Sequence, residues 1–112
     1  MCDSSLSGVP VTKRPLLVRE LSASELFNKA RACYEQKHYV EAAHFYELAA
    51  DQGHAKAQFN LGAMYENGQG VEEDDVKAFE WFVKAADQGY AAAQNNLGWM
   101  YDHGQGVEKD DV

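Results

Sequence analysis

The feature that most constrains this chain is an internal repeat, because the sequence matches itself when it is shifted by 36 residues. The segments 49–53 and 85–89 both read Ala-Ala-Asp-Gln-Gly. The match continues from 57–76 to 93–112, which share Ala-Gln, Asn-Leu-Gly, Met-Tyr, Gly-Gln-Gly-Val-Glu and Asp-Asp-Val. One fixed period of this size is typical of a solenoid, in which each unit buries its apolar face only against its neighbours.

Apolar residues at helical spacing predict that each unit consists of two antiparallel helices. In the most regular unit, the first helix is expected from about His54 to Asn67 and the second from about Asp75 to Gln88. Gly68 has the place of a left-handed C-terminal cap, and Gly70 is expected to loosen the turn that follows. Asp74 has the place of an N-terminal cap for the second helix. The sequence therefore predicts an all-α chain.

The unit that comes before this one is less regular. Ser22 and Glu25 have the spacing of a capping box and predict a helix from about Ala23 to Gln36. A second helix is expected from Tyr39 to Gln52. Because the connection between them lacks the Gly-x-Gly insertion of the later units, this unit is expected to be shorter between its helices.

The expected organisation is a flexible leader, 1–21, and a repeat domain, 22–112, with units at about 22–53, 54–89 and 90–112. The last unit is incomplete, since Val112 corresponds to the start of a second helix. Its first helix, with Leu97, Met100 and Tyr101, is expected to lack its own partner. Either the chain is a fragment of a longer array, or another chain or the leader covers that face. Marginal stability or self-association through this helix is expected for two and a half units.

Composition excludes several classes of partner. The chain has 10 basic and 18 acidic residues, so its formal net charge is -8. This charge repels phosphate backbones and anionic lipid head groups, so neither nucleic acid nor a membrane surface is an expected partner. The chain has only two cysteines, no secretory signal and no apolar run near the roughly 20 residues of a membrane span. These features favour a reduced protein in the cytoplasm.

The two later units resemble the Sel1-like repeat, a relative of the tetratricopeptide repeat. They share Ala-x-Ala-Gln-x-Asn-Leu-Gly-x-Met-Tyr-x-x-Gly-x-Gly-Val and an aspartate before the second helix, and the middle unit continues with Lys-Ala-Phe-x-Trp-Phe-x-Lys-Ala-Ala-x-Gln-Gly. The resemblance covers roughly residues 23–112. It implies an α/α solenoid, a right-handed superhelix of about two and a half helix-turn-helix repeats, and a role as an adaptor for other proteins. A cysteine-rich branch of the family is linked to penicillin binding or β-lactam hydrolysis, but Cys2 and Cys33 cannot reproduce its paired cysteines.

Positions that differ between units on one helix face are candidates for recognition. On the first helix, positions 56, 59, 63 and 66 or 67 are three to four residues apart and form one stripe. In tetratricopeptide-like folds this stripe lines the concave groove. The candidate partner-binding residues are Lys56, Phe59, Asn60, Asn96, Trp99 and His103. The aromatic residues would anchor an extended peptide or a helix, and the asparagine amides would pair with a backbone. Packing of the aromatics against an adjacent helix and a framework role for the asparagines stay open.

Nothing in the sequence points to catalysis, a metal or a cofactor. The four histidines are scattered without the spacing of metal ligands, and the acidic run 72–75 lies where carboxylates stabilise a helix N-terminus. No nucleophile with a neighbouring base can be named. The sequence therefore predicts a protein-binding adaptor that is not an enzyme. The alternative is a structural repeat segment of a larger multidomain protein or enzyme that continues past residue 112.

Overall fold

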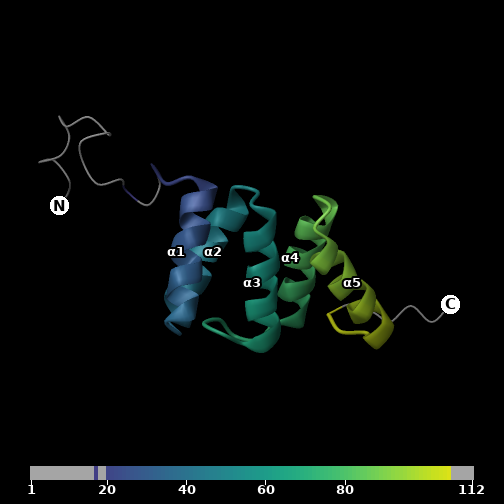
Figure 1. Cartoon of the computed structure of the whole chain (residues 1–112). Coiled ribbons are helices and arrows are strands. Elements are labelled where there is room, and N and C mark those ends of the chain that lie inside the picture. Colours follow the sequence, from purple (N-terminus) through teal and green to yellow (C-terminus); the bar gives the residue numbers. More distant parts are fainter. Residues whose placement is uncertain (1–16, 18–19, 107–112) are drawn as a thin grey trace, which may run out of the picture.

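The computed structural model describes residue 17 and residues 20–106. The expectations about the rest of the leader and about residues 107–112 lie outside the described residues. Within the described part the chain forms five α-helices and no strands (Figure 1). The helices are α1 (Ala23–Glu35), α2 (Tyr39–Asp51), α3 (Ala55–Asn67), α4 (Asp75–Asp87) and α5 (Ala91–His103). The predicted all-α fold is confirmed, and the four helices predicted with bounds match to within one residue at each end.

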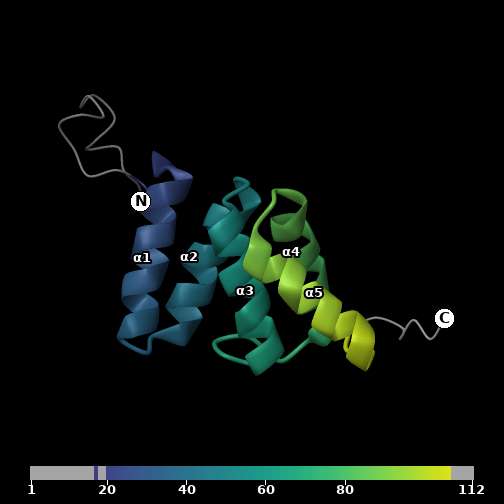
Figure 2. The same ribbon diagram turned by 45° about the vertical axis from the view of Figure 1, so that its right-hand side comes forward.

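The helices stack in the order of the sequence. Each helix packs mainly against the one before it and the one after it. Figures 1 and 2 show consecutive helices running in opposite directions, with α5 as the last helix of the stack. This is the arrangement of a helical solenoid, in which contacts are local and each helix depends on its neighbours. None of the described helices is long and apolar enough to cross a membrane.

Local sequence signals set the ends of the helices. The backbone N–H of Glu25 donates to Ser22 Oγ over 3.1 Å, and the N–H of Ser22 donates to Glu25 Oε1 over 2.8 Å. The predicted capping box is therefore confirmed. Asp74 Oδ1 accepts from the N–H groups of Val76 and Lys77, which confirms the predicted cap of α4.

The Gly-x-Gly loop is a contact between units as well as a turn. Gly68 ends α3 in the left-handed conformation, with a φ of 68°. Gly70 also has a positive φ, and a Cβ there would collide with the backbone carbonyl of Tyr39 at the start of α2. Gly106, its equivalent 36 residues later, lies in the same way against Asp75 at the start of α4. The expectation that Gly70 only loosens the turn missed this close approach, which leaves no room for a side chain.

The glutamine of the repeated Ala-Gln pair joins one unit to the next. Gln58 is buried, and its Nε2 donates to the carbonyl of Ala50 near the end of α2 over 3.1 Å. Its Oε1 accepts from Gln88 Nε2 over 2.9 Å. Gln94 repeats the first contact by donating to Ala86. These carbonyls lie at the ends of α2 and α4 and also accept from the N–H groups of Gly53 and Gly89, so the glutamine amides add a second donor that ties the next unit to each helix end.

Two aromatic clusters show how the shorter first unit is aligned with the second. Phe27 packs against Tyr46 and stacks on His54, with ring centroids 5.7 and 4.7 Å apart. Phe59 packs in the same way against Phe82 and Tyr90, at 5.4 and 5.2 Å. The partner rings are 36 residues apart, but Phe27 and Phe59 are only 32 apart. The first unit is therefore four residues shorter, as its missing glycine insertion predicts.

The last helix is only partly without a partner. Met100 is fully buried and packs with Ala78 and Phe82 of α4, and Leu97 packs against the same cluster. Leu97 and Met100 therefore do not form the exposed face that was expected, because α4 of the preceding unit covers them. The expected absence of a second helix from the last unit itself falls on residues outside those that the structure describes. Tyr101 is 45% exposed, and its ring packs edge-on against Phe79 of α4, with centroids 5.5 Å apart.

Candidate functional site

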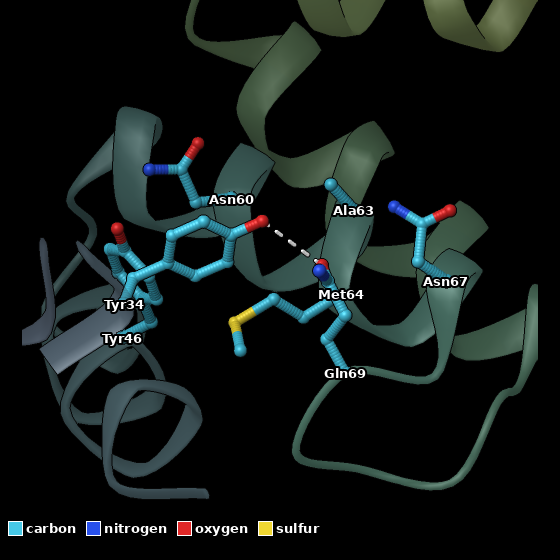
Figure 3. A pocket seen from close by; sticks show the side chains of 7 residues that line it. All are labelled: Tyr34, Tyr46, Asn60, Ala63, Met64, Asn67 and Gln69. Atoms are coloured by element: carbon cyan, nitrogen blue, oxygen red, sulfur yellow. Dashed lines mark hydrogen bonds between the residues drawn. The ribbon is translucent and has the colours of Figure 1, made fainter. Parts of the chain in front are cut away.

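A pocket of about 230 Å³ opens where α1, α2 and α3 meet (Figure 3). It is lined by Tyr34, Tyr46, Asn60, Ala63, Met64, Asn67 and Gln69. Four of these residues lie on α3, at positions 60, 63, 64 and 67, because a spacing of three to four residues places side chains on one helix face. The pocket therefore belongs to the junction between the first and the second unit.

The polar groups of the pocket are uncharged. Tyr34 Oη donates to Gln69 Oε1 over 3.1 Å, which ties the end of α1 to the Gly-x-Gly loop (Figure 3). Burial raises the pKa of Tyr46, and a hydrogen bond from the Asn60 side chain opposes part of that effect. Met64 is almost completely buried and supplies an apolar wall. Such a site offers neutral donors and acceptors beside an apolar surface, and it gives no formal charge to attract an ion.

The predicted residues of α3 fall on different faces of that helix. Asn60 lines the pocket. Phe59, its neighbour in sequence, is turned about 100° around the helix and packs between Phe82 of the same unit and Tyr90 of the following one. Lys56 is exposed, and its Nζ lies 5.7 Å from the centre of the Phe27 ring. The structure therefore brings Asn60 to the pocket and places Phe59 in the packing between helices.

The predicted residues of α5 lie one unit further along. Trp99 is 50% exposed and stacks on the ring of His103, with centroids 3.9 Å apart. His103 Nδ1 lies 2.8 Å from the Trp99 carbonyl. Asn96 is half-buried. Because Trp99 and His103 stand 36 residues after Ala63 and Asn67, an exposed aromatic pair replaces the small and amide side chains of the pocket.

The next junction differs in its chemistry as well. Gln105, the equivalent of Gln69, donates from Nε2 to Glu66 Oε2 over 3.2 Å and to Asp75 Oδ1 over 3.1 Å. Burial raises the pKa of Glu66, and the carboxylate of Asp75 raises it further. Glu66 stands 32 residues after Tyr34, so a carboxylate has the place of the pocket tyrosine. The neutral pocket is therefore a property of the first junction.

Sequence reasoning missed several residues of the pocket. The sequence could have indicated Asn67, because Asn67 belongs to the stripe of differing positions and is the equivalent of His103 one unit later. Tyr34 and Gln69 are 35 residues apart and meet only in the folded chain. Tyr46 and Met64 fit the apolar helical pattern and carry no separate signal.

Comparison with known proteins places these observations in a family. The model of the Sel1 repeat matches residues 37–54, 55–90 and 91–112. The Sel1 repeat protein of Oxalobacter formigenes is 44% identical, with a TM-score of 0.62 over 63% of this chain and 29% of that one. A protective antigen of uropathogenic Escherichia coli that displays an SLR fold is 37% identical, with a TM-score of 0.75 over 80% of this chain and 20% of that one.

The similarity to curated proteins extends over part of their length. An exopolysaccharide production negative regulator of Rhizobium leguminosarum bv. viciae is 34% identical over 62 residues, which are 55% of this chain and 23% of the regulator. The chain spans about a quarter or less of the curated relatives that it matches. The relatives are therefore much longer than the matched region.

Proposed function

Because the chain belongs to the Sel1 repeat family, whose members are generally non-catalytic modules of protein interaction, we propose that it is an adaptor for an extended segment of another protein. The observation that carries the proposal is the uncharged pocket at the first junction. An adaptor of this kind needs a surface that binds a segment of another protein without catalysing a reaction on it. The pocket has hydrogen-bonding groups and an apolar wall, which suit that task.

The amides of the pocket fit a peptide backbone. An extended backbone exposes N–H and C=O groups that no helix satisfies, and an asparagine or glutamine amide can pair with both. Asn60 and Asn67 are seven residues apart, which corresponds to roughly 10 Å along a helix. Three residues of an extended chain span about the same length. The two amides are thus spaced to hold two backbone groups of one bound segment.

The surroundings set the expected character of that segment. Ala63 is small and Met64 is apolar, so the pocket suits an uncharged side chain of moderate size. The stacked pair of Trp99 and His103 offers a second, aromatic contact one unit further along. The net charge of -8 disfavours acidic segments. We therefore expect a neutral or basic segment with one apolar residue at the pocket.

The test is a screen of random peptides against the full chain, followed by calorimetric titration of the strongest binder. Ala63→Trp introduces the residue that the next unit carries at the equivalent position, and it fills the pocket. We expect this variant to weaken binding by about tenfold or more, the usual effect of blocking a central contact. Glu80→Ala, at an exposed position of α4 outside the pocket, is the control. Equal affinity in Ala63→Trp and wild type, with both folded by circular dichroism, would exclude the pocket.

The alternative is a structural repeat segment of a larger protein. The length of the relatives supports it, since the chain matches a quarter or less of each. In that case the pocket is a packing imperfection and no peptide saturates it. A screen that returns only peptides insensitive to Ala63→Trp would favour this alternative.

A further inference from the structure

The α1 side of the pocket carries two charged side chains, Arg31 and Glu35, and both are exposed. Arg31 stands three residues before Tyr34, and Glu35 directly follows Tyr34, so the three residues share one side of the helix. Tyr34 itself lines the pocket. The two charges therefore lie at the rim of the pocket, next to its neutral lining.

The repeat register places these two positions beside the α3 residues of the pocket. The aromatic clusters align α1 with α3 by a shift of 32 residues. By this shift Arg31 corresponds to Ala63. Glu35 corresponds to Asn67, and both α3 residues line the pocket. Consecutive helices run in opposite directions, so α1 and α3 run in the same direction (Figure 1). Because equivalent positions of stacked units face the same side of a solenoid, α1 forms a charged wall beside the neutral face of α3.

The electrostatics of the pocket agree with this placement. Burial raises the pKa of Tyr46, which lines the pocket. The positive charge of Arg31 lowers the same pKa, and the negative charge of Glu35 raises it. Both charges are therefore close enough to act on a group inside the pocket.

The local physics of a helix does not account for the pair of charges on α1. Glu35 is the last residue of α1, where a carboxylate meets the negative end of the helix macrodipole. An arginine four residues before a glutamate is also the weaker order for an ion pair within a helix. Within the part of the chain that the structure describes, neither Arg31 nor Glu35 forms an ion pair. Both charges are therefore available to a bound segment.

On the basis of the adaptor function proposed above, we propose that the segment bound at the pocket carries an acidic and a basic side chain two positions apart, with an apolar residue between them. The acidic side chain pairs with Arg31 and the basic one with Glu35. The four-residue step between these positions spans roughly 6 Å along the helix. Two residues of an extended chain span about the same length, and their side chains point the same way while the one between them points to the opposite side. The middle side chain therefore enters the pocket beside Ala63 and Met64 while its neighbours contact α1.

The charges of the chain favour this mixed pattern over a segment with charges of one sign. The net charge of -8 disfavours a segment with only acidic side chains. The positive charge of Arg31 disfavours one with only basic side chains at the pocket. The wall thus narrows the class of segment that the pocket alone would accept.

The test uses short capped peptides whose central triplets are Asp-Leu-Lys, Lys-Leu-Asp and Ser-Leu-Ser. Both mixed orders are included because a bound segment can run in either direction. Each peptide is titrated into the isotope-labelled full chain, and the amide signals of Ala63 and Asn67 are followed by NMR. We expect the better of the two mixed peptides to bind about fivefold more tightly than Ser-Leu-Ser, as two exposed ion pairs predict. This advantage should disappear at about 1 M salt, where charges are screened within roughly 3 Å.

Two protein variants each reverse one charge of the wall, and peptides with Lys-Leu-Lys and Asp-Leu-Asp complete the set. Wild type should bind the mixed peptides more tightly than either of these. Arg31→Glu leaves two carboxylates on α1 and should bind Lys-Leu-Lys about fivefold more tightly than the mixed peptides. Glu35→Lys leaves two cations and should prefer Asp-Leu-Asp to the same extent. Lys84→Glu and Glu80→Lys make the same changes of net charge at exposed positions of α4, and they should keep the wild-type order.

Each contrary result has a distinct meaning. If Ser-Leu-Ser binds wild type as tightly as the mixed peptides, the inference is overturned and the adaptor function is left in place. If Arg31→Glu and Lys84→Glu change the order of preference alike, it is also overturned, because the effect then comes from the net charge. If no peptide shifts Ala63 or Asn67 at millimolar concentration, it is overturned as well, and the random-peptide screen decides on the adaptor function separately.

Discussion

Helices α3 and α5 have much of their sequence in common, including Asn-Leu-Gly and Met-Tyr at the same positions, but they differ in what surrounds them. α3 lies between α2 and α4 and contributes residues to the hydrophobic packing on both sides. α5 packs mainly on α4, and its equivalents of Gly62 and Tyr65, which are Gly98 and Tyr101, are exposed. The difference teaches that, in a stacked repeat, the burial of a residue is decided by the helices packed beside it and not by its own motif.

The largest expected contrast is between Phe59 on α3 and its equivalent, Asn95 on α5. Phe59→Ala removes a ring that contacts Phe82 and Tyr90, so we expect the free energy of unfolding to fall by roughly 2 to 3 kcal/mol. Asn95→Ala at an exposed site should change it by less than about 0.5 kcal/mol. Urea unfolding followed by circular dichroism measures both. Similar losses in the two variants would break the comparison.

The two glycines should respond with opposite signs to the same substitution. Gly62→Ala forces a methyl group against the Phe82 ring, and overpacking of this kind costs about 1 to 3 kcal/mol. Gly98→Ala meets no atom within 4 Å, so the helix preference of alanine should stabilise the chain by up to about 1 kcal/mol. The thermal midpoint should fall for the first variant and rise for the second. If the thermal midpoints of both variants rise, the Phe82 ring moves away from the new methyl group at position 62 without strain.

The N-terminal caps of the same two helices give the smallest contrast, in the dependence of stability on pH. His54 caps α3, since its Nδ1 accepts from the N–H of Ala57 over 3.1 Å, whereas the Tyr90 side chain makes no such bond at α5. Burial lowers the pKa of His54 below its ordinary 6.5, and the positive charge of Lys56 lowers it further. The unfolded chain therefore binds a proton before the folded chain does. Stability is fully present above pH 6.5 and is lost as pH falls below it towards the folded pKa.

His54→Asn keeps a capping side chain but cannot titrate, so its stability should change less between pH 7 and pH 5 than that of wild type. Changing Tyr90 to asparagine should leave the wild-type pH dependence in place. Unfolding curves across this range measure both. The cap assignment fails if His54→Asn loses as much stability on acidification as the wild type.

The helices could be predicted from the sequence because their signals are local. The capping box of Ser22 and Glu25, the cap at Asp74 and the left-handed glycine at 68 act within a few residues of their own positions. The pocket could be predicted only in part. The sequence predicts Asn60 as a recognition residue, but the bond between Tyr34 and Gln69 joins residues 35 apart, and no periodic pattern contains it.

The sequence by itself determined the number and the bounds of the helix pairs, since repetition, helical period and capping residues are written into each unit. Only the tertiary structure decided which faces are covered. Phe59 and Asn60 are adjacent in the chain, yet one packs against α4 and the other lines the pocket. Gly62 and Gly98 share one motif, yet only Gly62 meets a ring. The physical reason is that a helix determines its own backbone hydrogen bonds, whereas the burial of its side chains depends on the helices packed beside it.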